Sequence, residues 1–233
     1  CQVPMTRDDD GPARVCVTNA KGGTGKTTIA INIAGALNER DRDVLFVDVD
    51  PQGNATEGLG LLEEYDAGPP TLFDVLTDHE KRDRIDELIV EHEEMDVLPA
   101  NLALLEAERE LTIAHLMAQL QGTSAGSAGI EVLSSLAHNV TPDGVGGQHA
   151  LDSLSKAFDA LDREYDYIIV DSPPFYGRLT EASLFATRNV VVPALTEATS
   201  ERAIELLIDQ VAALEEFAGI EVNTVGVVAN RIE

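Results

Sequence analysis

The sequence predicts an α/β fold in which helices cover both faces of one doubly wound, mostly parallel sheet. Short runs of apolar, β-branched residues alternate along the chain with segments of helical apolar spacing, and this alternation is typical of parallel sheets. Two of the apolar runs end in aspartates and the first leads into glycines, at the end of the strand where ligands bind in such sheets. With 233 residues, the chain is long enough for one large domain with a full core.

Six runs rich in apolar and β-branched residues are predicted as strands, in chain order 14–20, 43–50, 95–100, 167–171, 189–193 and 222–229. Six segments with helical spacing or a suitable cap are predicted as helices: 29–37, 71–76, 84–91, 102–120, 151–161 and 201–217. Thr71 is expected to cap the second of these helices. Pro51 forces a loop directly after the second strand.

Three segments are expected to lie outside this regular pattern. Residues 1–13 are polar and acidic and are predicted to be a disordered tail, so that the domain spans 14–233. Residues 121–149 are rich in glycine and serine and are predicted to be a surface insertion or lid. A doubly wound domain normally covers its last strand with a further helix, so we expect the domain to continue beyond residue 233.

The charge balance is strongly acidic, with 42 Asp and Glu residues against 16 Lys and Arg, a formal net charge of −26. Such a surface repels itself at low salt and is screened at molar salt, where the Debye length is ~3 Å. The charge is spread along the whole chain, which favours a protein from a salt-accumulating halophile over an acidic site for one basic partner. At ordinary salt the same charge argues against binding nucleic acid; in a halophile this argument weakens.

Cysteines, histidines and long apolar runs exclude several classes of protein. The two cysteines provide neither a disulfide framework nor a metal cluster, and the five histidines fall at no ligand spacing. No apolar run approaches the ~20 residues that span a bilayer, and no secretory signal opens the sequence. These observations predict a cytoplasmic protein.

Residues 21–28 form the most informative motif, because they place glycines and lysines between a predicted strand and a predicted helix. Glycines let a backbone approach phosphates closely, and the following helix N-terminus favours anions. Lys26 is expected to reach the β- and γ-phosphates, and the Thr27 hydroxyl to ligate magnesium. The two lysines of this loop, together with Thr27 and Thr28, argue against a simple flexible turn. The predicted nucleotide-binding residues are Gly22, Gly23, Thr24, Gly25, Lys26, Thr27 and Thr28.

The motif departs from the usual phosphate loop, because its first glycine is replaced by Ala20 and a second lysine, Lys21, precedes Gly22. This form resembles the deviant Walker A motif of the ParA/MinD family of P-loop ATPases. The resemblance implies the P-loop NTPase fold, ATP and Mg²⁺ as cofactors, and a nucleotide-dependent homodimer. It also implies that Lys21 reaches the nucleotide of the partner subunit.

Three carboxylates are predicted beside the phosphates because they follow two buried strands: Asp48, Asp50 and Asp171. Asp171 has the Walker B form and is expected to hold magnesium, although a single aspartate at a strand end can also be a turn or helix cap. Residues 48–56 resemble the first switch of ParA-type proteins, which implies that Asp50 orients the attacking water and Asp48 supports the metal shell. Residues 172–174 resemble the second switch of that family.

Asn230 and Arg231 follow the last predicted strand and resemble the adenine-recognition position of MinD-like members. An asparagine amide matches the donor and acceptor edge of adenine, but an asparagine here could equally be a turn or cap residue. The segment 48–56 favours DNA partition, whereas Asn230 and Arg231 favour the MinD-like branch.

The leading hypothesis from the resemblance is a ParA-like partition ATPase. As an ATP-sandwich dimer it would bind DNA nonspecifically, associate with the nucleoid, and hydrolyse ATP when stimulated by a ParB-like protein. The alternative is a MinD-like or cargo-positioning ATPase that acts at a membrane or protein assembly. A metallochaperone or iron–sulfur scaffold would need a Cys-x-x-Cys pair, which the sequence lacks.

Overall fold

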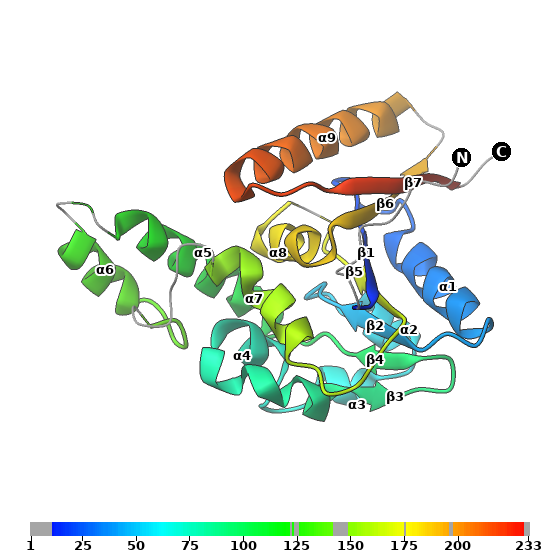
Figure 1. The fold of residues 1–233 in the computed structure, drawn as a ribbon, viewed down its shortest axis with the longest axis horizontal. Helices are drawn as coiled ribbons and strands as arrows, with labels where there is room; N and C mark the ends of the chain where they lie inside the picture. Colours follow the sequence, from blue (N-terminus) through cyan, green and yellow to red (C-terminus); the bar gives the residue numbers. More distant parts are fainter. Residues whose placement is uncertain are drawn as a thin grey trace.

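The computed structural model describes residues 11–121, 123, 126–141, 149–174, 176–195 and 198–230, and within these it contains one seven-stranded sheet. The strand order is β3-β4-β2-β5-β1-β6-β7 (Figure 1). All neighbouring strands pair in parallel except the edge pair β3 and β4. The strands are β1 (Ala13–Val17), β2 (Val44–Asp48), β3 (Val90–Glu91), β4 (Asp96–Leu98), β5 (Tyr167–Asp171), β6 (Asn189–Leu195) and β7 (Asn223–Asn230). The predicted fold class is therefore confirmed.

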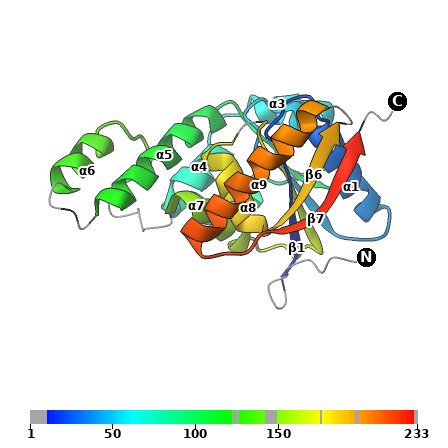
Figure 2. The same cartoon turned by 90° about the horizontal axis from the view of Figure 1, so that it is seen from above.

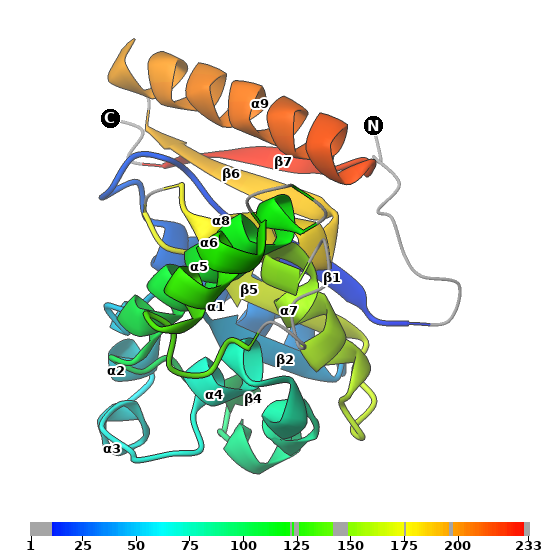
Figure 3. The ribbon, with the colours of Figure 1, turned by 90° about the vertical axis from the view of Figure 1, so that its left-hand side faces the viewer.

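Helices lie on both faces of this sheet (Figures 1 and 3). The helix α1 packs on one face, whereas α4, α5, α7, α8 and α9 lie on the other, with α9 against β6 (Figure 2). The helices are α1 (Lys26–Asn38), α2 (Asn54–Gly58), α3 (Leu62–Tyr65), α4 (Leu72–Thr77), the 3-10 helix η1 (His79–Leu88), α5 (Leu104–Leu120), α6 (Gly126–Ser134), α7 (His149–Asp159), α8 (Arg178–Thr187) and α9 (Ala198–Ala218). No helix among the described residues is long and apolar enough to span a membrane.

The core is divided by the sheet, because successive side chains of a strand point to opposite faces. In β2, Phe46 packs toward α1, whereas Leu45 and Val47 belong to the cluster that α4, α5 and α7 complete. All three side chains are fully buried, and each contributes about 1.5–3 kcal/mol relative to an exposed position. This double cover holds the central strands and fixes where their carboxyl ends lie.

The predicted helix at 84–91 is wrong in type. Residues 79–88 form the 3-10 helix η1, and Val90 and Glu91 then pair antiparallel with β4. The segment is mostly charged and buries only Ile85, so it has no apolar stripe to hold a longer α-helix. The helix α8 was not predicted at all, although nearly all of its residues are buried.

One further expectation is changed by the structure. Ala13 was assigned to the disordered tail but is buried in β1, while residues 1–10 of that tail lie outside the described residues. Within the predicted insertion, Gly126–Ser134 form α6, which packs against α5 and projects from the body of the molecule (Figure 1). Thr71 caps α4 as predicted, through a capping box with Asp74.

We expect the melting temperature to rise with salt because the surface carries a large excess of carboxylates. Described surface cations commonly pair with neighbouring carboxylates, as Arg84 does with Glu87 at 2.7 Å and Lys156 with Asp152 at 2.9 Å. The excess acidic side chains have no such cations and repel one another until salt screens them. Thermal melts from low to about 1 M potassium chloride, where the Debye length is ~3 Å, should show a steady increase. A midpoint that does not respond to salt would contradict this account.

Candidate functional site

The predicted site residues meet at the carboxyl ends of three neighbouring strands. β5 lies between β1 and β2, and its last residue, Asp171, is level with Val17 of β1 and with Asp48 of β2. The loop 21–28 leaves β1 at this edge and leads into α1. The sheet therefore brings the loop 21–28 close to Asp48, Asp50 and Asp171, as the positions of these residues in the sequence predicted.

The loop 21–28 has the backbone that its glycines allow. Gly23 and Gly25 have positive φ angles of 73° and 86°, in a backbone region that residues other than glycine rarely adopt. Gly25 is the N-cap of α1; no side chain in the described part of the chain caps this end, and the first turn of α1 contains no carboxylate. The first N–H groups of α1 therefore face the loop without a competing side-chain acceptor, which is the arrangement that favours an anion.

Asn19 anchors the start of the loop, and the sequence analysis did not identify it. Its side-chain amide donates to the carbonyl of Pro193 in β6 at 2.5 Å, and its Oδ1 accepts the Lys21 N–H at 3.0 Å. Asn19 is buried, so both bonds are made in a region with little competing water. This side chain fixes Lys21 relative to the sheet.

Lys26 lies almost completely inside the site, with 6% of its surface exposed. Burial lowers the pKa of its ammonium, and the nearby Asp171 and Asp50 carboxylates act in the opposite direction. A buried cation is stabilised by opposite charge. Lys26 is thus held where it can neutralise an anion in the loop.

Asp171 is the least satisfied carboxylate of the site. Both of its oxygens are buried, and neither has a hydrogen bond of normal geometry to a described residue. Burial first, and then the charge of Asp48, raise its pKa to about 8, while Thr27 and Lys26 lower it. A buried carboxylate with unused oxygens beside a hydroxyl suits a hard cation, which prefers oxygen ligands.

Asp48 is fully engaged within the chain. One of its oxygens accepts the Asp50 N–H at 3.1 Å, and the other accepts the N–H and hydroxyl of Thr56 at 2.9 and 2.8 Å. The Thr56 hydroxyl in turn accepts the Ala100 N–H at 2.9 Å. Burial raises the pKa of Asp48 to about 6 despite these bonds. The structure therefore places Asp48 beside the site as the residue that holds the 50–56 segment; its predicted part in the metal shell stays a prediction.

Asp50 lies in the turn that follows β2. Its side chain is 5% exposed, and its Oδ1 accepts the Gln52 N–H at 2.9 Å. Burial raises the pKa of this carboxyl, and the charge of Lys26 lowers it. Asp50 and Lys26 therefore share the site, as predicted.

The segment after Asp171 is tied to β1 and to α5. The Ser172 hydroxyl donates to the Val17 carbonyl at 3.2 Å. At the other end of the segment, the Glu108 carboxylate of α5 accepts the N–H groups of Arg178 and Leu179, the latter at 2.9 Å, at the start of α8. Glu108 was missed because nothing in its local sequence indicates which helix end it caps.

Asn230 lies against the loop 21–28. Its side-chain amide donates to the Thr24 carbonyl at 3.0 Å, and a Cβ on Gly25 would come within 2.3 Å of its Nδ2. The end of β7 therefore contacts the loop after β1, although Asn230 and Thr24 are 206 positions apart in the sequence. Arg231 lies outside the described residues.

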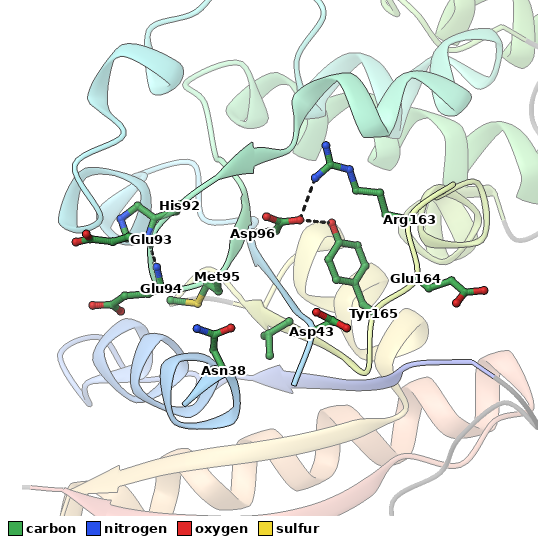
Figure 4. Close-up of a pocket in the computed structure, with 11 residues that line it drawn as sticks. Asn38, Asp43, His92, Glu93, Glu94, Met95, Asp96, Arg163, Glu164 and Tyr165 are labelled. Atoms are coloured by element: carbon green, nitrogen blue, oxygen red, sulfur yellow. Dashed lines mark hydrogen bonds and ion pairs between the residues drawn. The ribbon is translucent and has the colours of Figure 1, made fainter. Parts of the chain in front are cut away.

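A cavity of about 240 Å³ lies at the opposite, amino-terminal edge of the sheet (Figure 4). Tyr165 donates to Asp96 at 2.8 Å and Arg163 donates to the same oxygen at 3.0 Å. Asp43 and Glu94 also line this cavity. No group of three or more His, Cys, Asp or Glu side chains suited to a metal ion occurs in the described part of the chain.

Comparisons with known proteins agree with this geometry. A sequence model of the family described as AAA domain matches residues 13–121 and 138–223. The sporulation initiation inhibitor protein Soj of Bacillus subtilis is 31% identical over 220 residues, covering 94% of this chain and 72% of that protein. The chromosome partitioning protein ParA of Myxococcus xanthus is 34% identical over 185 residues, covering 78% of this chain and 52% of that protein. The chain thus spans from about half to three quarters of these relatives.

Solved structures show the same fold. Cobyrinic acid a,c-diamide synthase from Mycobacterium smegmatis, with bound ADP and magnesium, has a TM-score of 0.66 and 27% identity, covering 94% of this chain and 73% of that chain. The ATP complex of Cyanothece McdA has a TM-score of 0.69 and 22% identity, covering 94% of this chain and 70% of that chain.

Proposed function

This chain belongs to the ParA/MinD family of P-loop ATPases, and we propose that it is a partition-type ATPase that binds and hydrolyses ATP with magnesium and dimerises around the nucleotide. The observation that carries the proposal is the meeting of the loop 21–28 with Asp50 and Asp171 at one edge of the sheet. Relatives named for chromosome partitioning support the partition role.

The ATP phosphates would lie in the loop formed by Gly22, Gly23, Thr24, Gly25, Lys26, Thr27 and Thr28. The left-handed glycines and the uncapped start of α1 suit phosphate oxygens. Lys26 would neutralise the β- and γ-phosphates. Asn230, which contacts the loop through Thr24, is proposed to face the adenine, together with Arg231.

Magnesium fits the residues that are present. Asp171 has two buried oxygens that lack well-formed hydrogen bonds, and Thr27 lies close enough to affect its pKa. Magnesium typically takes only one or two protein oxygens and completes its shell with water and phosphates, so a larger carboxylate cluster is unnecessary. When bound, the ion would neutralise charge on the phosphate oxygens.

Hydrolysis would depend on positioning rather than on covalent chemistry. Asp50 is proposed to orient the attacking water, and Lys26 to stabilise the charge that develops on the γ-phosphate. Asp48 and Thr56 would hold the Asp50 segment through the three hydrogen bonds described above. Lys21 of one subunit is proposed to reach the nucleotide of the other.

The same ATPase chemistry could move DNA or another cargo. Nonspecific DNA binding by the dimer and stimulation by a ParB-like protein are proposed from the partition relatives, with the nucleoid as the place of action. The second candidate, a MinD-like or cargo-positioning ATPase, is favoured by Asn230, whose side-chain amide lies against the loop 21–28 through the Thr24 carbonyl. The acidic composition is consistent with a halophilic source.

The Thr27→Val variant tests the proposed magnesium site. Valine keeps the volume of threonine but removes the hydroxyl, so we expect phosphate release from ATP to fall about tenfold, as for loss of one oxygen that binds or orients the metal. Raising the magnesium concentration should restore part of the rate. Thr112→Val is the matched control, because that residue is exposed on α5 and its hydroxyl donates to the Glu108 carbonyl of its own helix. Equal rates in both variants and the wild type would contradict the proposal.

A further inference from the structure

The turn that carries Asp50 is braced from outside by Tyr65 of α3. The Tyr65 hydroxyl donates to the Pro51 carbonyl at 2.8 Å. The ring lies against Gly53, where a Cβ would come within 2.4 Å of the Tyr65 Cε2 atom. Gly53 also has a positive φ of 62°, so both the close contact and the backbone conformation call for glycine. Tyr65 therefore contacts the turn on both sides of Gln52.

The contacts of Tyr65 bear directly on the position of the Asp50 carboxylate. Within the turn, the Gly53 N–H donates to the Asp50 carbonyl at 2.8 Å, and the Gln52 N–H donates to the Asp50 Oδ1 at 2.9 Å. These bonds link Asp50 to the residues on which Tyr65 packs. A shift of Pro51 or Gly53 would rotate the Gln52 amide and with it the Asp50 side chain.

The backbone of Tyr65 is itself held in place by hydrogen bonds. The Tyr65 N–H donates to the Leu61 carbonyl at 3.1 Å, and the Leu61 N–H donates to the Thr56 carbonyl at 3.0 Å. Leu61 is buried in the cluster that packs around α1. Burial, together with the Asp66, Asp48 and Asp50 carboxylates, raises the pKa of Tyr65, so its hydroxyl keeps the proton that it donates.

We propose that Tyr65 is a positioning residue for Asp50: it holds the 50–53 turn so that the carboxylate keeps one orientation during hydrolysis. The inference rests on the proposed catalytic role of Asp50. It assigns to Tyr65 no contact with the nucleotide, so its loss should change the rate of the chemical step and leave ATP binding unchanged.

The test compares Tyr65→Phe with Tyr165→Phe. Each variant loses one tyrosine hydroxyl that donates a 2.8 Å hydrogen bond, but Tyr165 bonds to Asp96 at the opposite edge of the sheet (Figure 4). In steady-state phosphate release, Tyr65→Phe should lower kcat about five- to tenfold with KM unchanged, as expected for one hydrogen bond that matters only to the reacting geometry. Tyr165→Phe should leave kcat at the wild-type value.

Hydrogen exchange gives a second readout that does not require turnover. The amides of Gln52 and Gly53 should exchange faster in Tyr65→Phe than in the wild type, and at the wild-type rate in Tyr165→Phe. A wild-type kcat in Tyr65→Phe, a rise in KM that accounts for its slower rate, or unchanged exchange at 52–53 would each overturn the inference. If the wild-type protein released no phosphate, the proposed function would fail, and the exchange comparison would still decide whether Tyr65 holds the turn.

Discussion

The Asp50→Asn variant should bind ATP with near wild-type affinity and release phosphate at least ~100-fold more slowly, in the range typical of a lost proton acceptor. Asparagine preserves the volume of the side chain and can still accept the Gln52 N–H, so the turn should survive. It lacks the negative charge that would orient the attacking water. The phosphate loop is untouched, which is why affinity for a fluorescent ATP analogue should not change.

Asp43→Asn is the matched control for this experiment. Asp43 is exposed and precedes β2, whereas Asp50 follows it, so the two variants change the same charge at opposite ends of one strand. We expect wild-type turnover in Asp43→Asn. Wild-type turnover in Asp50→Asn would move the catalytic role elsewhere, with Asp48 as the first residue to test.

The Lys21→Ala variant should keep the nucleotide affinity of a single chain within a few-fold but lose ATP-dependent association. Lys26, inside the same loop, already lies beside Asp50 and Asp171, so Lys21 is not needed to neutralise that site. In the wild type, the specific rate of ATP hydrolysis should rise with protein concentration, because the active form is a dimer. In Lys21→Ala it should be low and independent of concentration.

Lys156→Ala controls for the simple loss of a lysine from an acidic protein. Lys156 pairs with Asp152 on α7, away from the loop, and its removal should leave the concentration dependence intact. A Lys21→Ala variant whose rate still rises with protein concentration would show that the second lysine of the loop has another role.

The sequence was most informative about the residues that follow the carboxyl ends of the strands. The glycines of 21–28 and the aspartates that end two apolar runs could be placed at one edge because parallel strands present their carboxyl ends together. β5 matched the predicted strand 167–171 because a short, continuous apolar run is typical of a parallel strand buried on both faces.

The residues that hold the site in shape could not be predicted. Asn19 bonds to Pro193, and Glu108 caps the start of α8; each contact joins segments that are distant in the sequence. Thr56 and Tyr65 lie near Asp50 along the chain, but their partners depend on how the 50–65 segment folds back. Residue type alone does not distinguish such anchors from ordinary surface side chains.

The missed helix α8 and the mistaken helix at 84–91 have opposite causes. α8 is buried nearly all round, so it shows no clear polar face from which to recognise a helix. The segment 84–91 is mostly charged, and only Ile85 and Ile89 of it are buried in the core. It therefore forms the end of a 3-10 helix followed by a short edge strand instead of an α-helix.

The most direct test of the account is the mass of the Asp50→Asn protein in solution with ATP and magnesium, measured by light scattering. Slow hydrolysis should trap the nucleotide-bound form, and we expect twice the 25.0 kDa mass of one chain. The Lys21→Ala, Asp50→Asn double variant should remain at the mass of one chain under the same conditions. A single-chain mass for Asp50→Asn at saturating ATP, or an equal dimer in the double variant, would contradict the proposal that ATP joins two copies of this chain through Lys21.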